Sequence, residues 1–210
     1  MSTHRLTMEE LAARVARDIP TGAYVNLGIG QPTKVADHLP AEREVVLHTE
    51  NGMLGMGPTA TGDLVDPDLT NAGKVPVTEL PGAAYFHHAD SFAMMRGGHI
   101  DVCVLGAYQV SERGDLANWH TGRAGDIPAV GGAMDLAVGA KQVYVMMTLL
   151  NKSGESKLVP SCTYPLTGLG CVNRVYTDVG IFETGPDGVR VLETFIGIDE
   201  LRGLLPVALR

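Results

Sequence analysis

The sequence predicts an α/β fold in which an open, mostly parallel sheet is flanked by helices. Short apolar runs of strand length alternate along the chain with segments whose apolar residues follow helical spacing. Many of the 26 glycines stand at the ends of those apolar runs, where a strand turns tightly into a helix. No internal repeat or shift in composition divides the 210 residues, so we expect a single domain over residues 1–210.

The first quarter of the chain predicts two rounds of helix and strand. A capping box formed by Thr7 and Glu10 marks the start of the first helix, whose apolar residues then follow helical spacing. The first strand ends in glycines at Gly28 and Gly30, and Glu50 directly follows the second strand. The expected elements are, in order, a helix over 8–19, a strand over 23–27, a helix over 32–39 and a strand over 44–49.

The rest of the chain continues the alternation and adds antiparallel strands late. A glycine-rich stretch over 53–58 and a polar, acidic loop over 62–73 come first. The elements expected after them are a short strand over 75–80 closed by Pro81-Gly82, a helix over 91–95, a strand over 100–110, a helix over 133–140, a strand over 142–150, two strands over 172–184 and 189–195 joined as a hairpin, and a helix over 199–205.

Composition and charge exclude several classes of function. With 16 basic against 24 acidic side chains, the net charge of −8 leaves no basic surplus to neutralise phosphates, so binding to nucleic acid or to an anionic membrane is not expected. No apolar run approaches the roughly 18 residues that span a bilayer, and the first residues lack the apolar core of a signal peptide. The three cysteines, an odd number, indicate buried thiols in a reducing compartment. We expect a cytoplasmic protein.

The common catalytic and binding motifs are absent from the sequence. It contains no G-x-G-x-x-G, no Walker A motif and no G-x-S-x-G elbow. The histidines and cysteines form no C-x-x-C or H-E-x-x-H pattern, so no metal site is expected. The adjacent His87 and His88 are more simply polar residues of the surface or of a substrate pocket.

Two places remain open to more than one interpretation from their local sequence. Glu50, between an apolar strand and a run of glycines, lies where open α/β sheets place their ligands, but an exposed turn glutamate would have the same surroundings. Gly131-Gly132 before a predicted helix is either a tight turn or an oxyanion site formed by free backbone N–H groups.

Longer segments resemble the B (beta) subunits of class I 3-oxoacid CoA-transferases, a likeness that runs from about residue 7 to 205. Within this family, four segments are most similar to the bacterial members that act on 3-oxoadipate: FHHADSFAMMRGGH, ANWHTG, IPAVGGAMDLA and GESKLVPSCTYPLTG. The segments that carry the family likeness are VNLGIGQPTKVADHLP (25–40), TENGMLGMGP (49–58), NAGK (71–74), SFAMMRGGHIDVCVLGA (91–107), GDLANW (114–119) and VGGAMDLAVGAK (130–141).

The resemblance implies a CoA-transferase (NagB/RpiA-like) fold and a role for four residues. Glu50 matches the catalytic glutamate of the family's S-E-N-G motif, with Thr49 in place of the serine. Gly132 matches the glycine whose backbone N–H contributes to the oxyanion hole. Asn26 matches an asparagine near the pantoate part of CoA, and Lys74 a lysine near the CoA phosphates.

The family likeness also implies a reaction and a partner. We expect CoA to move from succinyl-CoA to 3-oxoadipate through a glutamyl-CoA thioester, without a further cofactor, in a hetero-oligomer such as A2B2 whose A (alpha) subunit completes the site. One alternative is transfer to acetoacetate or another short 3-oxoacid, and another is a noncatalytic CoA-binding scaffold. Five side chains either line a dicarboxylate pocket or give it polar support: His87, His88, His99, His120 and Arg96.

Overall fold

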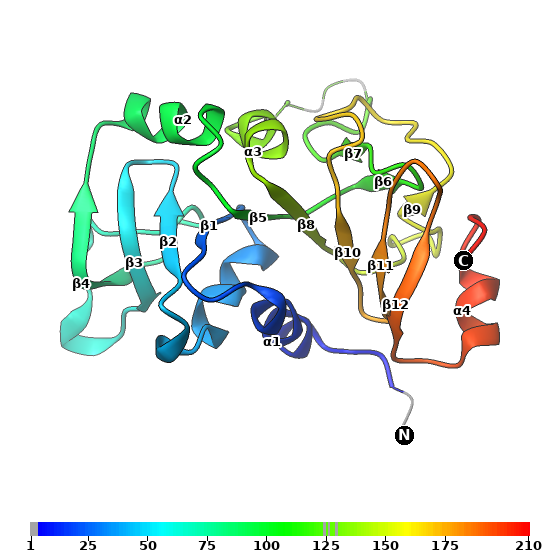
Figure 1. Ribbon diagram of the computed structural model, residues 1–210, viewed down its shortest axis with the longest axis horizontal. Coiled ribbons are helices and arrows are strands. Elements are labelled where there is room, and N and C mark those ends of the chain that lie inside the picture. Colours follow the sequence, from blue (N-terminus) through cyan, green and yellow to red (C-terminus); the bar gives the residue numbers. More distant parts are fainter. Residues whose placement is uncertain (1–3, 124, 126, 129) are drawn as a thin grey trace.

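One nine-stranded sheet runs through the protein in the computed structural model, which describes residues 4–210 except 124, 126 and 129 (Figure 1). The elements are α1 (Met8–Asp18), β1 (Tyr24–Leu27), η1 (Gln31–His38), η2 (Ala41–Arg43), β2 (Val46–Thr49), β3 (Met53–Thr59), η3 (Gly62–Leu64), β4 (Val77–Tyr85), α2 (His88–Arg96), β5 (Val102–Leu105), β6 (Gln109–Ser111), β7 (Leu116–Ala117), α3 (Ala133–Gly139), β8 (Gln142–Met146), β9 (Leu158–Val159), β10 (Arg174–Tyr176), β11 (Gly180–Glu183), β12 (Arg190–Thr194) and α4 (Ile198–Leu204).

The centre of the large sheet is parallel and both of its edges are antiparallel. Its order is β12-β11-β10-β8-β5-β1-β2-β3-β4, and the strands from β10 to β2 run parallel to one another. β11 and β12 extend one edge, while β3 and β4 extend the other. β6, β7 and β9 form a separate three-stranded sheet. The predicted parallel sheet and late antiparallel strands are confirmed, but the antiparallel pair β3–β4 was not expected.

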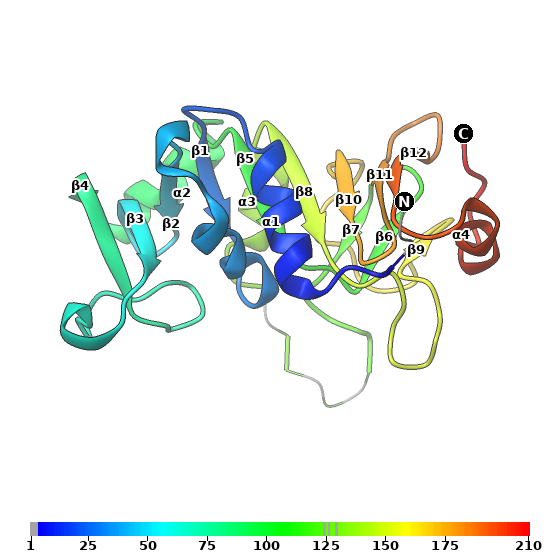
Figure 2. The same ribbon diagram turned by 90° about the horizontal axis from the view of Figure 1, so that it is seen from below.

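Helices cover both faces of the parallel strands, which gives three layers. In Figure 2, α1 and η1 lie in front of the sheet, with α2 and α3 on the opposite side. Side chains along each strand alternate between the two faces. On β5, Val102 and Val104 join the core under α1, whereas Cys103 and Leu105 join the core under α3. This burial of both faces is what the near-continuous apolar runs of β5 and β8 require.

Several predicted boundaries are shifted for identifiable reasons. The capping box at Thr7 and Glu10 is present and starts α1 at Met8, as expected. The predicted helix over 32–39 is a 3-10 helix with proline in its first turn. The strand expected over 100–110 is two strands that belong to different sheets, and the one expected over 172–184 is two antiparallel neighbours, β10 and β11.

The glycines of β3 allow close approach to β4 instead of ending the strand. A Cβ on Gly55 would lie 3.0 Å from the Cα of Ala83, and one on Gly57 would lie 2.4 Å from the Oγ1 of Thr78. The register between β3 and β4 shifts at these positions, so Pro81-Gly82 lies within β4. The prediction that Pro81-Gly82 closes a short strand is therefore wrong.

Among the described residues, no helix is both long enough and apolar enough to cross a membrane.

Candidate active site

The turn that carries Glu50 is a tight connection between β2 and β3. Thr49 ends β2 and Met53 begins β3. The Oγ1 of Thr49 accepts a hydrogen bond from the Met53 N–H at 3.0 Å, and the Thr49 carbonyl accepts one from the Gly52 N–H at 3.2 Å. Gly52 has φ +116°, and a Cβ there would lie 2.2 Å from the carbonyl oxygen of Phe86. Only glycine fits at position 52. The turn holds Glu50 at the carboxyl end of β2, which is the edge where parallel sheets bind ligands.

The structure brings Glu50 together with Gly132, the other residue assigned to catalysis from the sequence. Gly132 is the N-cap of α3, and its backbone N–H donates to the Oε2 of Glu50 at 3.2 Å. A Cβ on residue 132 would lie 2.3 Å from the same oxygen. The φ of Gly132 is −85°, which any residue adopts. A side chain at residue 132 would therefore displace the Glu50 carboxylate, although the backbone conformation would accept one.

Asn26 lies beneath this turn instead of on its surface. Its side chain is 3% exposed on β1. The Nδ2 atom lies 3.0 Å from the Nδ1 of His48 and 3.2 Å from the His48 carbonyl oxygen, which uses both amide hydrogens. The contact of Asn26 with CoA stays a prediction, and the Oδ1 atom is the part of the amide that these two bonds leave for it.

Lys74 lies at the opposite end of the β3–β4 arm, by which we mean β3, β4 and the loop that joins them. In Figure 1 the Glu50 turn is at the top of this arm, beside α2, and the joining loop is at the bottom. β3 is seven residues long, so the two ends lie on the order of 20 Å apart at about 3.4 Å per residue. Lys74 is exposed, has φ +61° and forms no ion pair with the described residues.

A cavity of about 300 Å³ lies between η1 and the turn that contains Lys74. CoA carries its phosphates at the far end of a long pantetheine chain from its sulfur, so a basic residue remote from the nucleophile suits this ligand. The cavity is lined by Gly30, Gln31, Thr33, Lys34, Asp37, Thr59, Asn71 and Val75.

A second cavity, of about 340 Å³, lies at the carboxyl ends of β1, β5 and β8. Lys157 lines it, and burial lowers the pKa of this lysine. No motif pointed to Lys157, because it belongs to an irregular segment that only the fold brings to this edge. The cavity itself agrees with the rule that ligands bind beyond the carboxyl ends of parallel strands.

The five side chains expected to line or support a pocket mostly make local contacts. The Nδ1 of His87 accepts from the Ala89 N–H and caps α2, the ring of His88 packs on Phe92, and Arg96 pairs with Asp135 at 2.6 Å. His120 accepts from the Gly122 N–H. His99 is exposed beyond α2. These contacts favour the supporting role.

The cysteines and histidines give no metal site within the described part of the chain. All three thiols are free. Cys103 is buried, as expected, whereas Cys162 and Cys171 are half-buried. Burial raises the pKa of the latter two to about 11, which keeps them protonated at neutral pH.

Two buried polar residues next to the Glu50 turn, His48 and Ser91, were not predicted from the sequence. His48 is 2% exposed, and burial lowers its pKa to about 4. Its Nε2 lies 2.9 Å from the Oγ of Ser91, which donates to the carbonyl of Thr49 at 3.0 Å. The signal available in the sequence was a histidine inside an apolar strand one residue before Thr49-Glu50.

Known proteins are similar to this chain over nearly its full length. The family model for coenzyme A transferase matches residues 8–194. The B subunit of 3-oxoadipate CoA-transferase from Pseudomonas putida KT2440 is 62% identical over 209 residues, which cover 99% of this chain and 98% of that one. The B subunit of succinyl-CoA:3-ketoacid coenzyme A transferase from Helicobacter pylori is 47% identical over 190 residues, covering 90% and 91%.

A solved structure shows the same fold at lower sequence identity. The acyl-CoA transferase apoenzyme from Escherichia coli O157:H7 superposes with a TM-score of 0.71 over 97% of this chain and 41% of that one, at 22% identity. Since the family model spans most of the chain and the relatives are similar over nearly their full length, this chain belongs to the coenzyme A transferase family.

Proposed function

We propose that this chain is the catalytic B subunit of a heteromeric enzyme that moves CoA from succinyl-CoA to 3-oxoadipate. The observation that carries the proposal is the contact between Glu50 and the Gly132 N–H, which places a carboxylate against a backbone donor at the carboxyl edge of the sheet. The 62% identity to the B subunit of a 3-oxoadipate CoA-transferase supports the substrate. An A subunit would complete the site, and CoA thioesters would be substrates without a further cofactor.

The first half of the reaction loads CoA onto Glu50. A Glu50 carboxylate oxygen attacks the thioester carbonyl of succinyl-CoA, the carbon–sulfur bond breaks, and CoA thiolate leaves a mixed anhydride. The thiolate then attacks the Glu50 carbonyl of the anhydride, which expels succinate and forms a glutamyl-CoA thioester. Holding a weak carboxylate nucleophile against the thioester makes each attack effectively unimolecular, an advantage of up to about 7–11 kcal/mol.

The second half runs these steps backward with the new acid. A carboxylate of 3-oxoadipate attacks the glutamyl-CoA carbonyl and releases CoA thiolate, which gives a second mixed anhydride. The thiolate attacks the 3-oxoadipyl carbonyl of that anhydride, so 3-oxoadipyl-CoA forms and Glu50 returns as a carboxylate. Charge and atoms balance at each step, and no proton transfer is required.

The Gly132 N–H has a defined role in the two attacks on the Glu50 carbonyl carbon. The Gly132 N–H donates to Oε2, one of the two carboxylate oxygens of Glu50. When thiolate or carboxylate adds to the Glu50 carbonyl carbon, the carbonyl oxygen of Glu50 becomes the oxyanion. A donor already aimed at this atom needs no reorganisation. Removing one such donor typically costs about 2.7–4 kcal/mol of transition-state stabilisation.

Two residues are proposed to bind CoA at a distance from the chemistry. Lys74 supplies positive charge for the phosphates beside the cavity that η1 forms with the 71–75 turn. Asn26 would accept a hydrogen bond from the pantetheine part through Oδ1, because its amide hydrogens face His48.

The substrate is tested by measuring CoA transfer from succinyl-CoA to 3-oxoadipate and, in parallel, to acetoacetate. The chain is co-expressed with the A-type subunit of its host, and the Glu50→Gln variant serves as an isosteric control. Preference for 3-oxoadipate that is lost in the control supports the proposal. Preference for acetoacetate would keep the mechanism and overturn 3-oxoadipate as the acceptor. Binding of CoA without any transfer by the wild-type complex would indicate a noncatalytic subunit.

A further inference from the structure

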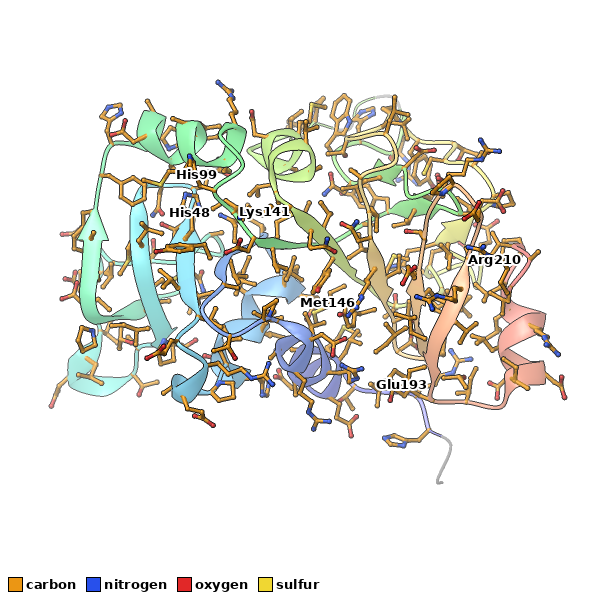
Figure 3. The ribbon with its side chains drawn as sticks, viewed as in Figure 1. His48, His99, Lys141, Met146, Glu193 and Arg210 are labelled. Carbon is orange, nitrogen blue, oxygen red and sulfur yellow. The ribbon has the colours of Figure 1, made fainter. Side chains whose placement is uncertain are left out.

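A row of buried polar side chains lies directly beneath the Glu50 turn. Asn26 of β1, His48 of β2 and Ser91 of α2 are 3%, 2% and 0% exposed. Figure 3 shows His48 on β2 below α2. Burying polar groups costs free energy unless each finds a partner, and these three find partners in one another and in the backbone around Thr49. We call Asn26, His48 and Ser91 the relay.

The first bond of the relay runs from Asn26 to His48. The Nδ2 of Asn26 faces both the Nδ1 of His48 and the His48 carbonyl oxygen. A carbonyl oxygen only accepts, so the amide must present its NH₂ group on this side, which fixes its orientation. The Nδ1 of His48 is therefore the acceptor. Burial lowers the pKa of His48 to about 4, so the imidazole is neutral at pH 7 and carries its one proton on Nε2.

The remaining bonds follow in the same direction. The Nε2–H of His48 donates to the Oγ of Ser91 at 2.9 Å, and the Ser91 O–H donates to the Thr49 carbonyl at 3.0 Å. That carbonyl belongs to the peptide bond between Thr49 and Glu50. The Ser91 hydroxyl has one proton to donate, and because the Nε2 of His48 is itself a donor, that proton goes to the Thr49 carbonyl. The tautomer of His48 therefore decides whether Ser91 can hold the peptide bond before Glu50.

We infer that the relay positions the nucleophile: it fixes the peptide bond before Glu50 and thereby the carboxylate against the Gly132 N–H. The inference rests on the proposed role of Glu50. The turn between Thr49 and Met53 is so short that a rotation of its first peptide moves the Glu50 side chain directly. Since well-packed apolar residues often replace buried polar networks without loss of stability, the benefit of keeping this one lies in specifying a single geometry.

The activity test compares two serine variants in the complex with the A subunit. Ser91→Ala removes the donor to Thr49. The control, Ser111→Ala, changes a serine of β6 in the smaller sheet that is equally buried, at 1% exposed, and donates a hydrogen bond to Asp115. We expect Ser91→Ala to lower kcat by about tenfold to a hundredfold, as misplacement of a reacting group by up to 1 Å does, with KM for succinyl-CoA within about twofold. Ser111→Ala should leave kcat unchanged.

A conservative pair at residue 48 gives a second readout. His48→Gln can keep an N–H directed at Ser91 and should retain most of kcat, whereas His48→Leu should lose as much as Ser91→Ala. Equal kcat in Ser91→Ala and Ser111→Ala, or equal loss in His48→Gln and His48→Leu, would overturn the relay. If wild type transfers no CoA and Glu50→Gln changes nothing, the proposed function fails instead, so the two failures are distinguishable.

The direction of the relay can be observed without an activity assay. In ¹⁵N spectra of the labelled chain, with the His48 signals assigned by their absence from His48→Gln, wild type should show the proton on Nε2 at pH 7. Asn26→Asp presents an acceptor to Nδ1 and should move the proton to that nitrogen. A wild-type His48 protonated on Nδ1 would contradict the inference, whether or not any variant folds.

Discussion

The two ends of the β3–β4 arm differ in the support that buried side chains give them. At the Glu50 end, the turn is held by its own backbone, by Thr49 and, from below, by the buried Ser91. At the Lys74 end, the turn is exposed and is held by Asn71, whose side chain accepts from the N–H groups of Gly73 and Val75. Hydrogen bonds hold both turns, but a buried side chain supports the end with the reactive carboxylate, whereas the end with the cation is open to solvent. We expect changes at the first to act on kcat and changes at the second to act on KM.

A second turn in the chain shows what is unusual about Lys74. Residues 150–156 form the same hydrogen-bonded turn as residues 70–76, with Asn151 in the place of Asn71. The left-handed position is Gly154 in one turn, with φ +82°, and Lys74 in the other, with φ +61°. A lysine in this conformation costs about 1 kcal/mol or more relative to an unstrained residue. This conformational cost fits the proposed use of the Lys74 side chain in binding CoA.

The largest effect is expected for the nucleophile itself. Glu50→Gln and Glu50→Ala should each lower kcat by at least about 10⁴-fold, because loss of a covalent nucleophile removes the reaction path and not just an interaction. Steady-state transfer assays on the co-purified complex measure this. Glu50→Asp should be almost as inactive, since its shorter side chain falls short of the Gly132 N–H. Substantial activity in Glu50→Gln would contradict the contrast between the two ends.

Gly132→Ala should come next, with a loss of kcat of about 10²–10³-fold. The added Cβ would lie 2.3 Å from the Oε2 of Glu50 and displaces the carboxylate, while the backbone at φ −85° accepts alanine. Gly203→Ala in α4, where a Cβ meets nothing within 4 Å, is the control. Equal kcat values for the two variants would show that contact with Gly132 does not matter.

The buried His48 predicts a pH dependence of stability at the Glu50 end. Burial lowers its pKa from 6.5 to about 4, so the unfolded chain takes up the proton first as the pH falls. The free energy of unfolding should therefore decrease between about pH 6.5 and pH 4, by up to about 3 kcal/mol. Urea unfolding across this window checks it. His48→Gln should show a shallower decrease, and identical slopes would contradict the assignment.

The smallest effects are expected at Lys74. Lys74→Ala should raise KM for succinyl-CoA about fivefold, the worth of an exposed charge pair of about 1 kcal/mol, with kcat unchanged. Lys74→Gly should raise KM equally but relieve the left-handed strain, which increases the free energy of unfolding by up to about 1 kcal/mol. Lys152→Ala, in the second turn, is the control. A fall in kcat with unchanged KM would reverse the roles of the two ends.

Most of the fold was predictable because its signals are local. The capping box fixes the start of α1, and the apolar runs of β5 and β8 reflect burial on both faces. The β3–β4 pair was missed because Gly55 and Gly57 resemble turn residues in sequence and serve close strand contact in space. Which glycine needs its missing Cβ depends on neighbours that the local sequence does not reveal.

The site was predictable only in part, for a related reason. The likeness to a family singled out Glu50 and Gly132, 82 residues apart, and the structure places them in contact. The same family likeness singled out Asn26. Its burial next to His48, however, results from the pairing of β1 with β2, which the local sequence does not reveal. The relay combines residues from three elements, so no window of sequence contains it.

The central claim is that Glu50 carries CoA as a thioester during turnover. The direct measurement incubates the complex with succinyl-CoA and no acceptor, digests the protein and analyses the peptides by mass spectrometry. We predict a peptide in which Glu50 has gained CoA with loss of water, and no such peptide from Glu50→Gln. A CoA adduct on another residue would contradict this claim, and so would the absence of any adduct from a complex that transfers CoA once 3-oxoadipate is added.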